Sequence, residues 1–310
     1  MTNLAPGSIR APVERGKGRT GWTMAMVATI AFSTSAPVAK VAFSMGLDPT
    51  SLLTVRWLMA TLLLSGTIAV SSPSRLRPEP KAVLMLGAAG LAFGVTSLSF
   101  FWSLTRIDVS IASMIFSLYP LVVLGLLALQ GEKFTHRNTI RLALGLGGVY
   151  LLIGPGGQVD LLGALLVLFS CCTFSVYLVM MQLYLRDYEA RTVTLYVVGT
   201  MSLFTLGWWL VQGAQWSDPG WQGWLAIGVL VLVGTYLAQL AVFAAVRSIG
   251  SAQMALLGPL ETLLTVIWSL LFLQERLSVV QWAGGGLILF GAGLAGPRLH
   301  RIRWRPRLRL

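Results

Sequence analysis

Long runs of apolar residues, separated by short polar segments, make up the chain from residue 21 to residue 296. Each run is close to the roughly 20 residues that an α-helix needs to cross the hydrocarbon core of a bilayer. Gly, Pro, Ser and Asp residues mark the boundaries between the runs. The pattern predicts ten helices, over residues 21–44, 50–70, 82–104, 109–130, 138–154, 160–184, 192–212, 222–246, 250–273 and 279–296.

The composition favours lipid over water as the main solvent. Charged residues make up 11% of the chain, whereas soluble domains carry about 25%. The mean hydropathy is +0.76. The longest predicted loops, 71–80 and 213–220, are too short to fold as domains. We therefore expect an all-α polytopic membrane protein, and we exclude soluble enzymes and receptors with a soluble catalytic module.

The basic residues indicate an orientation. If the N-terminus is cytoplasmic, 19 of the 23 Lys and Arg residues fall on the cytoplasmic side, and four fall on the other side: Lys40, Arg56, Arg106 and Arg276. Cytoplasmic loops carry such an excess of positive charge. We therefore predict that both basic tails, 1–20 and 297–310, are cytoplasmic, which accounts for the net charge of +12 without nucleic acid.

The two halves of the chain match weakly at a near-constant offset of 142 residues. The matching pairs include Gly21 with Gly163, Phe32 with Phe174, Ser33 with Ser175, Ile107 with Ile249 and, after one inserted residue, Glu132 with Glu275. Each half holds five predicted helices. Because five is odd, the second copy must enter the membrane in the opposite direction.

The sequence thus predicts two inverted five-helix repeats, 21–154 and 160–296, joined by a linker at 155–159. Inverted repeats recur in secondary transporters, whose substrate site lies near the membrane midplane between the repeats. A duplicated scaffold without transport is the alternative. The chain has no P-loop, HExxH, GxSxG or CxxC motif, so we do not expect an enzyme.

Segments 31–40, 48–57, 101–135 and 243–278 resemble the drug/metabolite transporter superfamily. More specifically, residues 21–296 are similar to the ten-span exporters built from two EamA repeats, among which the YddG-type aromatic amino acid exporters are a candidate branch. The sequence departs from that pattern at Thr262, where Pro commonly follows the Glu, and at Gln274, where Gly is usual.

The resemblance implies a secondary transporter that exports small metabolites, most of all amino acids, by alternating access in a bacterial cytoplasmic (inner) membrane. A multidrug or cationic-compound exporter remains an alternative. We expect a small-molecule substrate, a lipid bilayer around the protein, a proton as candidate coupling ion, and a monomer or weak homodimer. We expect no nucleic acid, cofactor or metal; the adjacent Cys171 and Cys172 are interpreted as apolar packing residues.

One ionisable residue, Glu261, lies near the centre of a predicted helix, and its repeat mate is Tyr119. Charged groups at this depth usually face the protein interior or water. Gln253, Thr265 and Trp268 share its helical face. The functional interpretation is that Glu261 pairs with a substrate ammonium or takes a proton; the alternative is a structural carboxyl group.

Other polar and aromatic side chains of the predicted helices are candidates to line the cavity. They are Ser33, Ser35, Lys40, Ser97, Trp102, Tyr177, Tyr236 and Gln239. Lys40 and Arg56 either extend to the interface or attract a carboxylate in an outer vestibule, and Lys40 is the preferred candidate.

Three prolines interrupt predicted helices: Pro37, Pro120 and Pro259. Proline has no backbone N–H, so the carbonyl four residues earlier loses its helical partner. The carbonyl of Ser33, for example, needs another partner. The prolines are candidate hinges, or else fixed kinks that shape the bundle.

Overall fold

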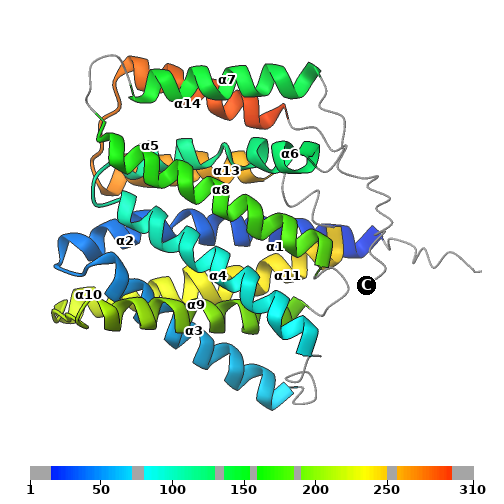
Figure 1. Cartoon of the computed structure of the whole chain (residues 1–310), viewed down its shortest axis with the longest axis vertical. Coiled ribbons are helices and arrows are strands. Elements are labelled where there is room, and N and C mark those ends of the chain that lie inside the picture. The colour runs from blue at the N-terminus through cyan, green and yellow to red at the C-terminus, as the bar shows by residue number, and fades with distance from the viewer. Residues whose placement is uncertain are drawn as a thin grey trace, which may run out of the picture.

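The computed structural model describes residues 15–71, 80–129, 136–153, 159–184, 190–249 and 257–294, and their regular structure is helical throughout (Figure 1). The first half contains α1 (Arg15–Ser33), α2 (Ser35–Ser44), α3 (Pro49–Ser71), α4 (Pro80–Ser103), α5 (Val109–Phe116), α6 (Tyr119–Leu129) and α7 (His136–Ile153). The second half contains α8 (Leu161–Tyr184), α9 (Ala190–Val211), α10 (Gly220–Val231), the π-helix η2 (Leu232–Leu237), α11 (Ala238–Ile249), α13 (Gly258–Phe272) and α14 (Val279–Gly293).

Within the described residues, six stretches are long and apolar enough to cross a membrane: Thr20–Ser44, Pro49–Ile68, Val83–Ser103, Leu161–Met180, Thr192–Val211 and Gly220–Val242. Four shorter apolar helices occupy the places of the remaining predicted spans: Val109–Val123, Thr139–Ile153, Gly258–Phe272 and Val279–Gly293. Large apolar side chains face outward, as Leu84 and Leu203 do with about 70% of their surface exposed. The prediction of an all-α membrane protein is confirmed, while the count of ten spans and their orientation stay predictions.

Three predicted helices are not continuous. The helix expected at 21–44 divides at Thr34, and the helix expected at 109–130 divides at 117–118. Both breaks lie just before a proline, where the helical hydrogen bond is lost. The helix expected at 222–246 contains the π-helical turn η2, which the sequence did not predict. Pro259 lies in the first turn of α13, and residues 250–256 of that predicted helix lie outside the described residues.

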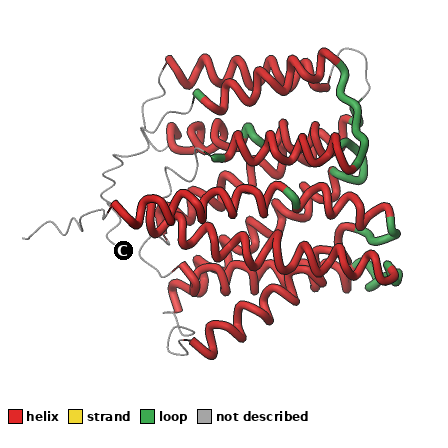
Figure 2. The backbone as a smooth tube through the Cα atoms, turned by 180° about the vertical axis from the view of Figure 1, so that it is seen from behind, coloured by secondary structure: helices red, strands yellow, loops and turns green. Residues whose placement is uncertain are grey.

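The helices α3, α5, α8, α10 and α14 all begin at one end of the bundle, which we term the capped end (left in Figure 1). Figure 2 shows the described loops gathered mostly at this end. The Asp48 carboxylate accepts hydrogen bonds from the amides of Thr50 and Ser51 at the start of α3. Asp160 accepts from the amide of Gly163 in the first turn of α8 (2.7 Å).

Carboxylates at helix N-termini satisfy free amides and complement the positive end of the helix dipole. Aspartates also stand before α5, as Asp108, and before α10, as Asp218. Asp48, Asp160 and Asp218 therefore accept hydrogen bonds from amides at helix N-termini, whereas the Asp108 side chain makes no capping hydrogen bond.

Two glycines that match between the halves of the chain make equivalent contacts with neighbouring helices or loops. A Cβ added to Gly21 at the start of α1 would lie 2.7 Å from Cγ2 of Ile249 at the end of α11. A Cβ added to Gly163 at the start of α8 would lie 2.7 Å from Cγ2 of Ile107, just after α4. Gly21 matches Gly163 and Ile107 matches Ile249 at an offset of 142. The two helix pairs thus pack in the same way, as two related repeats require.

The outermost helices also pack in pairs. At one edge α7 packs on α14, and at the opposite edge α3 packs on α9 (Figure 1). Gly148 of α7 and Gly284 of α14 let the two backbones meet, since a Cβ on either would lie within 2.7 Å of the other's carbonyl oxygen. Small residues allow such close approach between helices in membranes. The helices between these edges form the centre of the bundle.

We expect Gly163→Ala to lower the melting temperature of the purified protein, because the added methyl group overlaps the Ile107 side chain. Overpacking of this kind costs about 1–3 kcal/mol. The matched control is Gly207→Ala in α9, where an added Cβ meets nothing within 4 Å. Thermal unfolding in detergent measures both. Equal melting temperatures for the two variants would contradict the close packing of α8 on the loop after α4.

Candidate transport site

The break between α1 and α2 is held by the other repeat. The Thr265 hydroxyl of α13 shares its hydrogen between the Ser33 carbonyl, at 3.2 Å between the two oxygens, and the Glu261 carbonyl of its own helix, at 3.0 Å. The Trp268 indole N–H donates to the Ser33 hydroxyl oxygen at 3.0 Å. The carbonyl freed by Pro37 thus finds a partner on another helix. Of the predicted site residues, Ser33 and Trp268 are brought together, as partners of one another.

The break between α5 and α6 is held in a similar way by α8. The Cys171 thiol donates to the Phe116 carbonyl, with 3.5 Å between sulfur and oxygen. The Ser175 hydroxyl donates to the Tyr119 carbonyl at 3.0 Å. Cys171 is buried, and Cys172 is exposed. The sequence suggested only a packing role for Cys171. Its hydrogen bond could not be predicted, because Pro120, which frees the Phe116 carbonyl, lies 51 positions earlier in the chain.

Seven aromatic rings form a continuous group in the centre of the bundle, with neighbouring ring centroids 4.7–5.8 Å apart. We term this group the aromatic cluster; its members are Phe93, Phe100, Phe101, Phe116, Tyr119, Phe174 and Tyr177. Tyr177 stacks on Phe93 at 4.7 Å, and Tyr119 meets Phe174 edge to face at 5.0 Å. The two tyrosines were predicted to line the site. The five phenylalanines were missed, although spacings of seven between Phe93 and Phe100 and three between Phe174 and Tyr177 place these pairs on common helix faces.

Glu261 stands in the first turn of α13 and is partly buried. It interacts electrostatically with Tyr119, whose hydroxyl lies 3.4 Å from the position of a Cβ on Gly258. Within the described residues, no hydrogen bond or ion pair engages the Glu261 carboxylate. Tyr119 and Glu261 are repeat mates, and two positions related by a two-fold axis are close only beside that axis. The pair therefore marks the centre of the molecule, where the sequence predicts the substrate site.

Lys40 and Glu275 hold the loop between α4 and α5 at the capped end. The Lys40 ammonium donates to the carbonyl of Leu104 and to that of Ile107. The Glu275 carboxylate accepts from the amides of Val109 (2.7 Å) and Ser110 (3.0 Å), and from the Ser110 hydroxyl (2.5 Å). The charges of Glu275 and of Asp108 also act on Lys40. In this conformation Lys40 binds helix-end carbonyls, and the ends of α2, α5 and α13 are tied together.

Glu275 was seen in the sequence only as a repeat match. Its neighbour Gln274 has a φ of +54°, a left-handed conformation that favours glycine, the residue that the resemblance leads us to expect at this position. The left-handed turn after α13 directs the chain back toward the start of α5, where the Glu275 carboxylate caps the helix.

The remaining predicted site residues within the described ranges lie on several other helices, and no hydrogen bond or ring contact joins them to Glu261 or Tyr119. Ser97 is buried in α4, and Tyr236 and Gln239 are partly buried in η2 and α11. The Trp102 indole donates to the Thr50 hydroxyl oxygen at 3.2 Å and so joins α4 to α3. Ser35 accepts a hydrogen bond from Arg56, a buried residue of α3. Gln253 lies outside the described residues.

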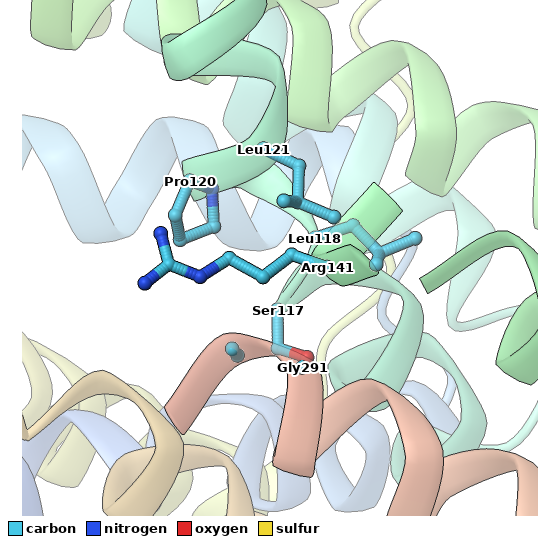
Figure 3. A pocket seen from close by; sticks show the side chains of 7 residues that line it. Ser117, Leu118, Pro120, Leu121, Arg141 and Gly291 are labelled. Carbon is cyan, nitrogen blue, oxygen red and sulfur yellow. The ribbon is translucent and has the colours of Figure 1, made fainter. Parts of the chain in front are cut away.

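A separate pocket opens where the break between α5 and α6 faces α7 and α14 (Figure 3). Its lining residues are Ser117, Leu118, Pro120, Leu121, Arg141, Gly291 and Ala292. Pro120 is the one predicted site residue in this lining, and neither Glu261 nor Tyr119 takes part. The pocket therefore differs from the central site.

The sequence profile of the EamA-like transporter family matches residues 19–154 and, a second time, residues 161–296. The chain belongs to the EamA-like transporter family. This EamA-like protein is 23% identical over 284 residues to the uncharacterized transporter YcbK of Bacillus subtilis, covering 87% of this chain and 90% of that protein. It is 25% identical over 212 residues to an uncharacterized transporter of Archaeoglobus fulgidus, covering 68% and 75% of the two chains.

A protein of known crystal structure superposes on this EamA-like chain with a TM-score of 0.59 and 22% identity, covering 89% of this chain and 96% of the other. At this identity the likeness shows the fold alone. The two family matches correspond to the two repeats seen in the packing, and the role of the protein is transport rather than catalysis.

We expect Glu275→Ala to lower the melting temperature, because two amides and one hydroxyl at the start of α5 lose their acceptor. Loss of a helix cap costs about 1–2 kcal/mol. Arg276→Ala removes an exposed neighbouring side chain and serves as the control, with no expected change. Thermal unfolding compares the two. A Glu275→Ala protein as stable as the wild type would contradict the capping role.

Proposed function

We propose that this EamA-like transporter exports small metabolites from the cytoplasm, most of all amino acids, by alternating access between its two repeats. We place it in a bacterial cytoplasmic membrane with both termini on the inner side, so that the capped end faces outward. The observation that carries the proposal is that Glu261 and Tyr119, which are repeat mates on two different repeats, interact electrostatically, in a fold with two helices interrupted before prolines. Transporters with inverted repeats bind their substrates between the two repeats, near the membrane midplane.

The interrupted helices support the proposal that one repeat moves against the other. Each break in the first repeat is held by side chains of the second repeat: the α1–α2 break by α13, and the α5–α6 break by α8. A shift of one repeat against the other therefore changes the hydrogen bonding of both breaks. Non-helical backbone at membrane depth is tolerated where protein buries it or a cavity hydrates it, so the same carbonyls can exchange protein partners for water as a site opens.

The chemistry of the centre supports an amphiphilic substrate. The aromatic cluster offers flat apolar surfaces next to a carboxyl group, Glu261, that no described residue neutralises. An aromatic or large apolar side chain fits the rings, and an ammonium group fits the carboxylate. An amino acid carries both. In this interpretation Glu261 binds the substrate ammonium, or a proton when the site is empty.

The ties at the capped end support a conformation closed on that side. Lys40 and Glu275 bind the two ends of the loop between α4 and α5, and α5 packs on α13. Release of substrate at this end requires these contacts to separate. Export then follows if the centre loads from the cytoplasmic side and discharges when the capped end opens.

A multidrug or cationic-compound exporter is the second candidate. It rests on the same observation, the free carboxylate of Glu261 beside aromatic rings, which also suits an organic cation. The two candidates differ in whether the ligand must carry a carboxylate of its own.

We expect purified protein in liposomes to move amino acids across the membrane, and Glu261→Gln to abolish this flux or reduce it at least about tenfold. The reason is that removal of one member of a buried charge pair costs at least about 2 kcal/mol. Asp218→Asn, which changes an exposed acid at the capped end, is the matched control and should transport as the wild type does. Radiolabelled counterflow over a panel of amino acids, nucleosides, sugar phosphates and quaternary cations measures the flux.

Flux of cations alone would replace the amino acid proposal by the drug exporter. No flux of any compound in the panel, with normally folded protein, would contradict secondary transport and favour a scaffold. In that case Glu261, Lys40 and Tyr236 variants should leave the cellular phenotype unchanged while expression stays normal.

A further inference from the structure

Arg56 of α3 is an arginine enclosed by the protein at membrane depth, with 3% of its surface exposed. It comes about two turns after the start of α3 at Pro49 and points toward the junction of α2, α4 and η2. The sequence left open whether this residue extends to the interface. The burial shows that it does not.

Arg56 donates three hydrogen bonds to neutral groups among the described residues. The Nε–H donates to the Thr235 hydroxyl oxygen at 2.9 Å. The Nη2 group donates to the Gly234 carbonyl at 3.1 Å and to the Ser35 hydroxyl oxygen at 3.3 Å. The guanidinium carbon also lies 4.8 Å from the ring centroid of Trp57 and 5.6 Å from that of Phe101, a member of the aromatic cluster.

The Nη1 group is buried and has no hydrogen-bond partner among the described residues. None of the described carboxylates bonds to Arg56 either. A guanidinium stays charged in proteins and carries five N–H donors. A buried charge without a counterion is costly, and a buried donor without an acceptor adds to that cost. The neutral contacts and the two rings offset this only in part, and an anionic acceptor at Nη1 would offset the remainder.

The backbone around Arg56 is irregular on both sides. Ser35 follows the break between α1 and α2, and Gly234 and Thr235 belong to the π-helix η2. A Cβ on Gly234 would lie 2.5 Å from the Ser35 hydroxyl oxygen, so glycine is needed for this close approach. π-Helical turns are frequent at functional sites. Here the two irregular segments come together around the one guanidinium.

We propose that Arg56 binds the carboxylate of the transported substrate, with Nη1 donating to one carboxylate oxygen and the Ser35 hydroxyl donating to the other. Ser35 accepts a bond from Nη2, so its own hydrogen is available to donate. This inference rests on the proposed function and narrows its substrates to carboxylic acids, including amino acids. The proposed site then has two opposite charges, Arg56 and Glu261, one on each side of the α1–α2 break. On one side Arg56 contacts Ser35. On the other side Thr265, which follows Glu261 by one helical turn, contacts Ser33.

The test compares ligands that differ only in the carboxylate. L-Phenylalanine and L-leucine are measured against L-phenylalaninamide and L-leucinamide, by equilibrium binding and counterflow with full-length protein. We expect wild-type protein to bind the acids at least about tenfold more tightly than the amides. In Arg56→Gln the acids should weaken at least about tenfold, since a charge-assisted pair is lost, while the amides change little.

Three further variants test whether the effect is specific to the Arg56 charge. Arg106→Gln removes an exposed arginine that pairs with Asp160 at 3.5 Å, and it should bind the acids as the wild type does. Arg56→Lys keeps the buried charge and should retain part of the preference for acids, even if Arg56→Gln folds poorly. Ser35→Ala should weaken the acids selectively and leave the amides unchanged.

The outcomes separate this inference from the proposed function. Equal binding of acids and amides by the wild type, with flux retained, would overturn the carboxylate site and leave transport standing. Acid binding that is unchanged in Arg56→Gln and Arg56→Lys would show Arg56 to be a support for the π-helix only. Loss of flux for every compound in wild-type protein would overturn both proposals.

Discussion

A peptide group inside a bilayer must find a hydrogen-bond partner within the protein, because the hydrocarbon offers none. The Ser33 carbonyl is the point where this constraint shapes the molecule most. Pro37 removes its helical partner, and Thr265, 232 positions later in the chain, supplies another. The Phe116 carbonyl repeats the situation with Cys171. The second repeat thus bonds to the first at the two places where helices of the first repeat are interrupted.

The inverted repeat accounts for much of what the centre contains. Because repeat mates come close only near the two-fold axis, the electrostatic interaction of Glu261 with its mate Tyr119 indicates that these two positions lie near that axis. The repeats differ at this point, since one supplies an acid and the other a phenol. The pseudo-symmetry of the repeats accounts for the position of this pair near the axis, and the difference in sequence between the two halves accounts for its two different side chains.

Charge is distributed according to two separate physical demands. Basic residues gather at the tails and alternate loops, as the orientation of a membrane protein requires. Acidic residues gather at the capped end because five helices begin there, and amides at helix N-termini favour carboxylates. Asp48, Asp160 and Glu275 serve in this way. Glu261 and Arg56 neither set the orientation nor cap a helix, and both lie within predicted membrane helices, so these two charged groups are the candidates for a role in transport.

The sequence alone determined the all-α membrane class, the approximate positions of most helices, the presence of two repeats and the family resemblance. These properties follow from patterns that can be counted along the chain: apolar runs of membrane length, the number of basic residues per loop, and the constant offset between Gly21 and Gly163 and between Ile107 and Ile249. The breaks at Pro37 and Pro120 were also predictable, since the missing N–H of proline acts on its own helix.

Only the tertiary structure decided which partners these groups find. That Cys171 is a donor, that Glu275 caps α5, that Lys40 binds Leu104 and Ile107, and that Arg56 is enclosed all depend on contacts between residues distant in the chain. The π-helix η2 escaped prediction for the same reason, because its irregular turn is matched to Arg56 and Ser35 on other helices. Hydrophobic periodicity reports which face of a helix is buried, whereas the packing of the helices decides which polar group stands opposite.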